Sequence, residues 1–103
     1  MIIKRIQYTV TSDFAETNKK NIAKVMEDLR AINSPGIRYS SYVLEDGKTF
    51  MHYVVLQDEA AGKILNDLES FQRFQLAIKN SNPEVPPKLD NLTLVGSSYE
   101  LMG

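Results

Sequence analysis

The first ten residues alternate between two sets of side chains. Alternation with a period of two is typical of a strand that buries one of its faces. We therefore predict a strand over residues 2–10. One side of this strand carries Ile2, Lys4, Ile6, Tyr8 and Val10, and the other carries Ile3, Arg5, Gln7 and Thr9.

The periodicity then becomes helical. Asp13 and Glu16 stand three positions apart, the spacing of a capping box, just before an amphipathic stretch. Pro35 and Gly36 predict the end of this helix, because neither residue continues one readily. The apolar positions, spaced by three and four residues, are Ile22, Val25, Met26, Leu29 and Ile32.

Two β-rich stretches follow, at residues 37–45 and 48–56, and only Asp46-Gly47 separates them. This dipeptide predicts a hairpin with a two-residue type I′ turn. Counting outward from that turn places Val43 opposite Phe50, with the register continuing from there. One face of the hairpin then carries Ile37, Tyr39, Ser41, Val43, Phe50, His52, Val54 and Leu56, and the other carries Arg38, Ser40, Tyr42, Leu44, Thr49, Met51, Tyr53 and Val55.

The last third of the chain has weaker signals. Residues 58–66 are expected to form a loop with a short helical turn, because Gly62 weakens a helix. Ser70 is a candidate N-cap for a second helix with an apolar stripe. Three prolines predict an extended loop over residues 80–90, and residues 91–99 resume a strand in which Gly96 marks a bulge or a close approach.

These elements predict a single α+β domain over residues 1–103 with the order βαββαβ. The arrangement is a ferredoxin-like, four-stranded antiparallel sheet with two helices on one face. The other face would expose an apolar patch of a kind that seldom remains in contact with water on a monomer. We therefore expect a homodimer in which two such faces meet. The patch consists of Tyr42, Met51, Tyr53 and Val55.

Composition narrows the possible functions. The net charge is −1 without any basic run, so nucleic-acid binding is not expected. The chain has no cysteine, which excludes disulfides, thiolate metal sites and a cysteine nucleophile. No stretch has the length of a signal peptide or a membrane span, so we expect a cytoplasmic protein without membrane contact.

Several short motifs, in this order, resemble the antibiotic-biosynthesis-monooxygenase-like family of the dimeric α/β barrel superfamily, including its uncharacterised bacterial members. The resemblance spans nearly the whole chain. It rests on Asn18, Gly36-Ile37-Arg38-Tyr39, Asp46-Gly47-Lys48-Thr49-Phe50-Met51-His52, Leu68-Glu69-Ser70-Phe71-Gln72-Arg73-Phe74 and Leu94-Val95-Gly96-Ser97.

The resemblance implies a dimeric α/β barrel with a ligand cavity between the sheet and the helices of each subunit. Members of the superfamily include cofactor-independent oxygenases of aromatic polyketides or quinols, and haem-degrading oxygenases. Several of these enzymes have a tryptophan at the site, whereas this sequence has none.

His52 is the only histidine, so no metal site built on a pair of histidines can form. The isolated glycines offer no phosphate cradle for flavin or nicotinamide, and we expect no cofactor. Two interpretations of His52 stay open: a catalytic proton acceptor or donor in an apolar pocket, or a half-buried histidine bonded to Ser41, Tyr39 or a carbonyl. Hydrolysis by a triad is not favoured, since no acid alternates onto its face.

The other candidate site residues have two interpretations each. Tyr39, a second catalytic candidate, hydrogen bonds to a phenol or quinone oxygen or packs as an aromatic residue. Asn18 presents its amide to a ligand, caps the helix or is solvated. Phe71 and Phe74 form core or a cavity wall. The candidate ligand-binding set is Ser41, Asn18, Phe50, Phe71 and Phe74.

Three hypotheses of function follow. The first is a cofactor-independent monooxygenase of an aromatic or quinol-like small molecule, in which His52 deprotonates the substrate while Tyr39 and Ser41 orient it. The second is a non-catalytic dimeric binding or stress-associated protein. The third is a haem-degrading oxygenase, the least favoured of the three.

Overall fold

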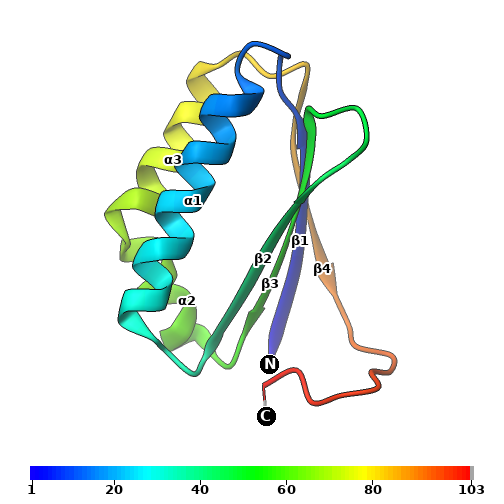
Figure 1. The fold of residues 1–103 in the computed structure, drawn as a ribbon. Coiled ribbons are helices and arrows are strands. Elements are labelled where there is room, and N and C mark those ends of the chain that lie inside the picture. Colours follow the sequence, from blue (N-terminus) through cyan, green and yellow to red (C-terminus); the bar gives the residue numbers. More distant parts are fainter. Residues whose placement is uncertain (103) are drawn as a thin grey trace.

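The computed structural model describes residues 1–102. Its four strands and three helices follow the order β1–α1–β2–β3–α2–α3–β4 (Figure 1). Their bounds are β1 Ile2–Thr9, α1 Ala15–Ile32, β2 Ile37–Val43, β3 Thr49–Leu56, α2 Glu59–Asp67, α3 Glu69–Asn80 and β4 Val85–Leu92.

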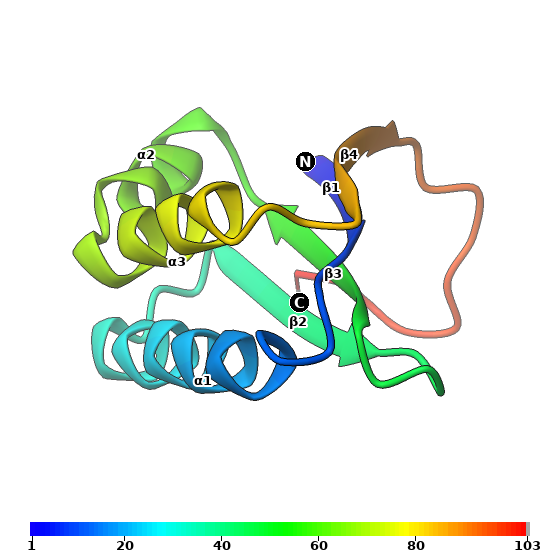
Figure 2. The ribbon, with the colours of Figure 1, turned by 90° about the horizontal axis from the view of Figure 1, so that it is seen from above.

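The strands form one antiparallel sheet in the order β2-β3-β1-β4. All the helices lie on one side of this sheet, and the other side has no helix over it (Figures 1 and 2). The predicted ferredoxin-like fold is therefore confirmed, with its second helical region divided into α2 and α3. None of the helices in residues 1–102 is long and apolar enough to cross a bilayer.

The hairpin register is confirmed, but the predicted turn type is wrong. Val43 pairs with Phe50, as expected. The connection comprises residues 45–48, because the amide of Leu44 already donates to the carbonyl of Thr49 at 2.8 Å. A type I′ turn needs two residues with positive φ, and in this loop only Gly47 has one, at 74°. The longer loop keeps the same pairing because it adds one residue to each side.

The prediction of a loop at residues 58–66 is wrong, because α2 is a helix of 9 residues. Asp58 caps it by accepting a hydrogen bond from the amide of Ala61 at 2.9 Å. Gly62 is accommodated because the helix passes close to β3: an added Cβ would lie 3.3 Å from the Leu56 Cδ1. The predicted cap at Ser70 is also wrong, since the N-cap of α3 is Leu68, which is also the C-cap of α2.

The last strand lies earlier than predicted. Residues 85–92 form β4, and residues 93–99 are not a strand. Pro86 and Pro87 lie opposite Tyr8, where the β1–β4 register shifts. A bulge on an edge strand tolerates proline, because no ladder hydrogen bond is required from its missing N–H. Gly96, expected to mark a bulge in the strand, lies beyond it.

The long helix α1 confirms the periodicity prediction, although it begins without the predicted capping box. Its N-cap is Phe14, with no side-chain cap, and Asp13 belongs to the preceding turn. The helix ends at Asn33, whose φ of 51° is left-handed, as is common at helix C-termini.

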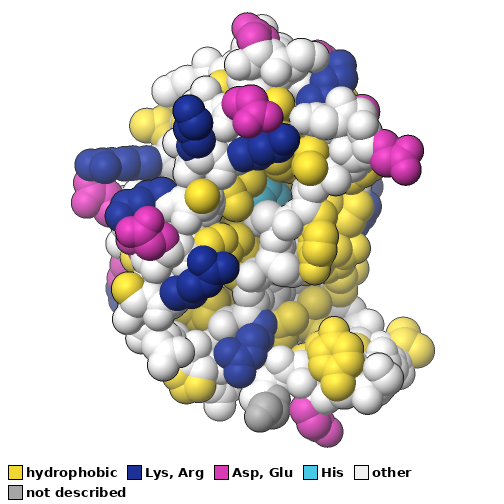
Figure 3. Space-filling model, viewed as in Figure 1, with side chains coloured by type: hydrophobic (Ala, Val, Ile, Leu, Met, Phe, Trp, Pro, Cys, Tyr) yellow, Lys and Arg dark blue, Asp and Glu magenta, His cyan; other side chains and the backbone are white. Residues whose placement is uncertain are grey.

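The core lies between the helix layer and the sheet. It holds the inward side chains of β1 and β3, including Tyr8 and Phe50, together with residues of all three helices. The opposite face of the sheet exposes Tyr42 and contains Tyr53, whose rings meet edge to face with centroids 6.2 Å apart. Figure 3 shows charged side chains gathered over the helices and hydrophobic ones exposed along the sheet and the C-terminal segment.

Candidate functional site

A pocket of about 540 Å³ lies between the sheet and the helices α2 and α3. This volume is within the range of small-molecule sites. Its walls are mainly apolar and aromatic, and β1, β3, β4, α2 and α3 all contribute to them. The apolar wall residues include Ile6, Val54, Leu56, Leu65, Phe71, Phe74, Ile78 and Leu89.

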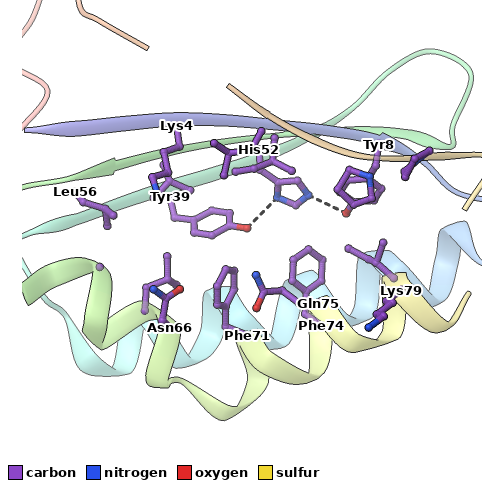
Figure 4. A pocket seen from close by; sticks show the side chains of 18 of the residues that line it. Lys4, Tyr8, Tyr39, His52, Leu56, Asn66, Phe71, Phe74, Gln75 and Lys79 are labelled. Carbon is purple, nitrogen blue, oxygen red and sulfur yellow. Dashed lines mark hydrogen bonds between the residues drawn. The ribbon is translucent and has the colours of Figure 1, made fainter. Parts of the chain in front are cut away.

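His52 is the centre of a polar cluster in the wall of this mainly apolar pocket. It lies on the central strand β3, is 1% exposed and hydrogen bonds through both ring nitrogens. Its Nε2 is 2.9 Å from the Tyr8 hydroxyl. Its Nδ1 is 2.7 Å from the Ser41 Oγ and 3.1 Å from the Tyr39 hydroxyl. The two tyrosine hydroxyls therefore approach the imidazole from opposite sides, above Phe71 and Phe74 (Figure 4).

The network continues to helix α1 through Asn18, whose Nδ2 donates to the Tyr8 hydroxyl at 2.8 Å. Since Tyr8 accepts this bond, its own proton is free to be donated to Nε2 of His52. Nδ1 of the neutral imidazole then carries the ring proton and donates it to Ser41. This single assignment satisfies the chain from Asn18 to Ser41 and makes Nε2 the ring acceptor.

Burial controls the protonation of these groups. Desolvation lowers the pKa of His52 from 6.5 to about 4, so the imidazole is neutral at pH 7. Desolvation also raises the pKa of Tyr8 well above its usual range, although the bond from Asn18 partly opposes this effect. The pKa of Tyr39 is raised by its burial and by the nearby Tyr8. At neutral pH the network is therefore uncharged.

The structure brings the predicted site residues together, but only some of them line the pocket. His52, Tyr39, Phe71 and Phe74 line the pocket. The other three lie behind the wall and contact residues that line it, rather than lining it themselves. These are Ser41 and Asn18, which bond to His52 and Tyr8, and Phe50, which stacks on Tyr8 with ring centroids 5.7 Å apart.

Asn18 has neither of the two structural roles that the sequence suggested, a helix cap or a solvated side chain. It is neither a helix cap nor solvated, since it is 0% exposed within α1. Its Oδ1 has no hydrogen-bond partner among the described residues. A buried acceptor without a partner costs about 1–3 kcal/mol of stability.

Tyr8 is the principal site residue that the sequence interpretation missed. The alternation of residues 2–10 placed it on the buried face, but no role was assigned to it. The signal was the topology: in a βαββαβ fold the first strand lies beside the third, and β1 does pair with β3 here. Pro83, Pro86 and Pro87 were also missed, because a segment predicted as a loop forms one side of the pocket.

His52 offers no free nitrogen to haem iron, because both nitrogens of this only histidine are already hydrogen bonded within the protein. Among residues 1–102, no three His, Asp or Glu side chains lie close enough together to hold a metal ion.

Comparison with solved structures finds the same fold in several proteins. An antibiotic biosynthesis monooxygenase superposes with a TM-score of 0.76 at 16% identity, covering 93% of this chain and 100% of that one. Rv0793 from Mycobacterium tuberculosis gives 0.77 at 12% identity, covering 95% and 98%. SnoaB, a cofactor-independent oxygenase from Streptomyces nogalater, gives 0.71 at 14% identity, covering 96% and 97%.

These structures include members of the family that the sequence motifs resemble, so the recognition is confirmed at the level of fold. Identities of this size establish the shared fold alone. No protein-family model matches the chain. No curated protein matches it in sequence either.

Proposed function

We propose that this protein binds a small aromatic, quinol-like molecule in the pocket beside His52 and oxygenates it without a cofactor. The observation that supports this most directly is a buried neutral imidazole, joined to two tyrosine hydroxyls, at one wall of an apolar pocket of ligand size. The likeness in fold to a cofactor-independent oxygenase agrees with this chemistry.

The reaction begins when the substrate's phenolic proton moves to the Tyr8 hydroxyl while the Tyr8 proton moves to Nε2 of His52. The electron-rich substrate anion reduces dioxygen, and carbon–oxygen bond formation gives a hydroperoxide. Loss of water then converts the ring carbon that took up oxygen, which carries one hydrogen, to a carbonyl. One O₂ is consumed, one oxygen atom remains in the product, the other leaves as water, and the proton returns from His52.

The low pKa of His52 is compatible with this role. Moving a proton from a phenol of pKa about 10 to an imidazole of pKa about 4 costs about 8 kcal/mol, at about 1.4 kcal/mol per pKa unit. A turnover of about 1 per second corresponds to a barrier of about 17 kcal/mol. The proton transfer therefore fits below the overall barrier, as a transient step rather than a resting state.

Within this proposal the residues have different tasks. His52 and Tyr39 face the substrate, Tyr8 relays the substrate proton to His52, and Phe71 and Phe74 hold the substrate ring. Ser41 keeps His52 in the Nδ1–H tautomer. For the remaining two, Asn18 directs the Tyr8 hydroxyl toward His52 and Phe50 supports the Tyr8 ring from behind.

A second candidate is a non-catalytic binding protein with the same pocket. One observation favours it: both nitrogens of His52 already have partners within the protein, so the network is complete without a substrate. Binding and oxygenation therefore have to be measured separately.

The test uses an oxygen electrode and a panel of naphthoquinols and anthrones, with the autoxidation rate of each subtracted. We expect one O₂ per carbonyl formed and a loss of at least about 100-fold in kcat for His52→Gln. Tyr42→Phe, on the opposite face of the sheet, serves as the control. If compounds bind but none is oxidised faster than in buffer, the oxygenase proposal fails and the binding protein remains.

We also propose a homodimer formed through the open sheet face, the arrangement implied by a dimeric α/β barrel. Its support is the aromatic pair of exposed Tyr42 and half-buried Tyr53 on that face. Sedimentation velocity tests it: wild type should sediment as a dimer and Tyr53→Lys as a folded monomer. A wild-type protein that stays monomeric at about 100 μM contradicts the dimer, since obligate interfaces persist well below that concentration.

A further inference from the structure

Lys4 is an unusual residue for its position. It lies on the helix-facing side of the central strand β1, between Ile2 and Ile6. Its partner on the neighbouring strand β3 is Val54. Lysine is seldom found on a core-facing surface unless an acid accompanies it. Lys4 is only partly exposed, and none of the salt bridges among residues 1–102 includes it.

Lys4 lines the same pocket as His52, and the charge of that pocket is one-sided. Of the residues along its wall, only Lys4 and Lys79 are charged, and no carboxylate is among them. The chain as a whole has a net charge of −1, so this positive lining is a local feature. Lys79 is exposed near the Tyr8 end, whereas Lys4 lies toward Asn66 at the other end (Figure 4).

The sheet register sets the distance between Lys4 and His52. Ile6 pairs with His52, and Lys4 is two residues farther along the same strand. Two residues of extended strand span about 7 Å. A ligand whose reacting oxygen meets the tyrosine–histidine network would therefore reach Lys4 with a substituent about one ring farther away.

We propose that the ligand of this pocket is an aryl anion, a hydroxyaryl carboxylate in the native reaction, whose acid group binds the Lys4 ammonium. The inference rests on the pocket being a ligand site, as in the proposed function, and adds the class of molecule it selects. The apolar walls hold the ring system, and Lys4 neutralises the acid group. Asn66, across the pocket from Lys4, supplies an amide at the same end.

The experiment compares two fluorescent probes that share one aromatic framework. 8-Anilinonaphthalene-1-sulfonate carries an anionic group, and N-phenyl-1-naphthylamine does not. Each is titrated into wild type, Lys4→Met, Lys4→Arg and the matched control Lys88→Met, which removes the same charge from the opposite face of the sheet. Because His52 is the only histidine, its imidazole NMR signals report whether a probe occupies this pocket.

We expect both probes to shift the His52 signals. The ratio of the sulfonate Kd to the amine Kd should rise about tenfold in Lys4→Met, because a charge-assisted contact is lost. It should stay within about threefold of wild type in Lys4→Arg and Lys88→Met. Circular dichroism confirms that each variant is folded.

Two outcomes would overturn different statements. If neither probe moves the His52 signals, the pocket is not a ligand site and the proposed function fails with this inference. If the neutral probe moves them but the Kd ratio is the same in Lys4→Met as in wild type, the aryl-anion selectivity is wrong. In that case the pocket and the proposed function stand.

Discussion

The two faces of this sheet are made by the same strands and have different chemistry. On the helix-facing side, Phe50 and His52 are 2% and 1% exposed. On the open side, Tyr42 is 56% exposed and Arg5 forms an ion pair with Asp90 at 3.2 Å that is partly open to solvent. Both faces contain aromatic and polar residues, so composition does not distinguish them.

The difference comes from what covers each face. Helices remove water from one side, and there desolvation alone moves the pKa of His52 to about 4 and makes each hydrogen bond of its network costly to break. On the open side water solvates the same kinds of group, so their contacts contribute little to stability. The comparison teaches that a polar residue acquires unusual chemistry here through its covering layer.

The largest expected contrast is between core and open-face aromatics of the same hairpin. Phe50→Ala should lower the free energy of unfolding by about 3–5 kcal/mol, because it removes a buried ring that stacks on Tyr8. Tyr42→Ala should change it by about 0.5 kcal/mol or less at a protein concentration low enough to keep the chain monomeric. Urea denaturation measures both. Equal losses would show that the open face is as well packed as the core.

Acid should lower the free energy of unfolding through His52 on the covered face. The pKa of His52 is about 4 in the folded state and 6.5 in the unfolded chain, so the unfolded state binds more protons between these values. Stability is therefore highest above pH 6.5 and falls as the pH drops toward 4. The loss from pH 7 to pH 5 should be about 2 kcal/mol, at up to about 1.4 kcal/mol per pH unit.

The control for this prediction is His52→Gln, which should lack that loss between pH 7 and pH 5. In NMR, the imidazole signals of wild type should not titrate between pH 8 and pH 5.5. A titration midpoint near 6.5 would mean that water reaches the ring and would contradict the contrast between the faces.

Removing one tyrosine hydroxyl should also lower stability more on the covered face than on the open face, but by less than removing a whole ring. Tyr8→Phe leaves Nε2 of His52 and the Asn18 amide without their buried partner and should cost about 1–2 kcal/mol. At a concentration low enough to keep the chain monomeric, Tyr53→Phe on the open face should cost about 0.3 kcal/mol or less. Thermal unfolding followed by circular dichroism compares them. A Tyr53→Phe loss as large as that of Tyr8→Phe would remove the distinction.

The smallest effect has the opposite sign. Lys4→Met should stabilise the protein by about 0.5 kcal/mol, because an unpaired lysine on the helix-facing side is replaced by an apolar chain of similar length. Lys88→Met, on the open face, should change stability by about 0.2 kcal/mol or less. Midpoints of urea unfolding resolve the pair. A clear destabilisation by Lys4→Met would show that Lys4 stabilises the fold itself.

Local patterns were sufficient to predict an element where apolar residues recur on one face over several turns of helix or several residue pairs of strand. The alternation in β1 and in the hairpin, and the helical period of α1, predicted these elements and the His52–Ser41 pairing. The patterns failed for α2 and β4, where a glycine or prolines argued against regular structure. In both places a tertiary contact outweighed the local preference: α2 packs against β3, and β4 pairs with β1 through a bulge.

By itself, the sequence determined the order of the elements, the register of the hairpin and the grouping of Tyr39, Ser41 and His52 on one face. These follow from local geometry, because side-chain direction in a strand alternates whatever surrounds it. Only the tertiary structure decided that Tyr8 and Asn18 complete the network and that Lys4 borders the same pocket. Such contacts join residues far apart in the chain, and burial, which sets their chemistry, exists only once the helices cover the sheet.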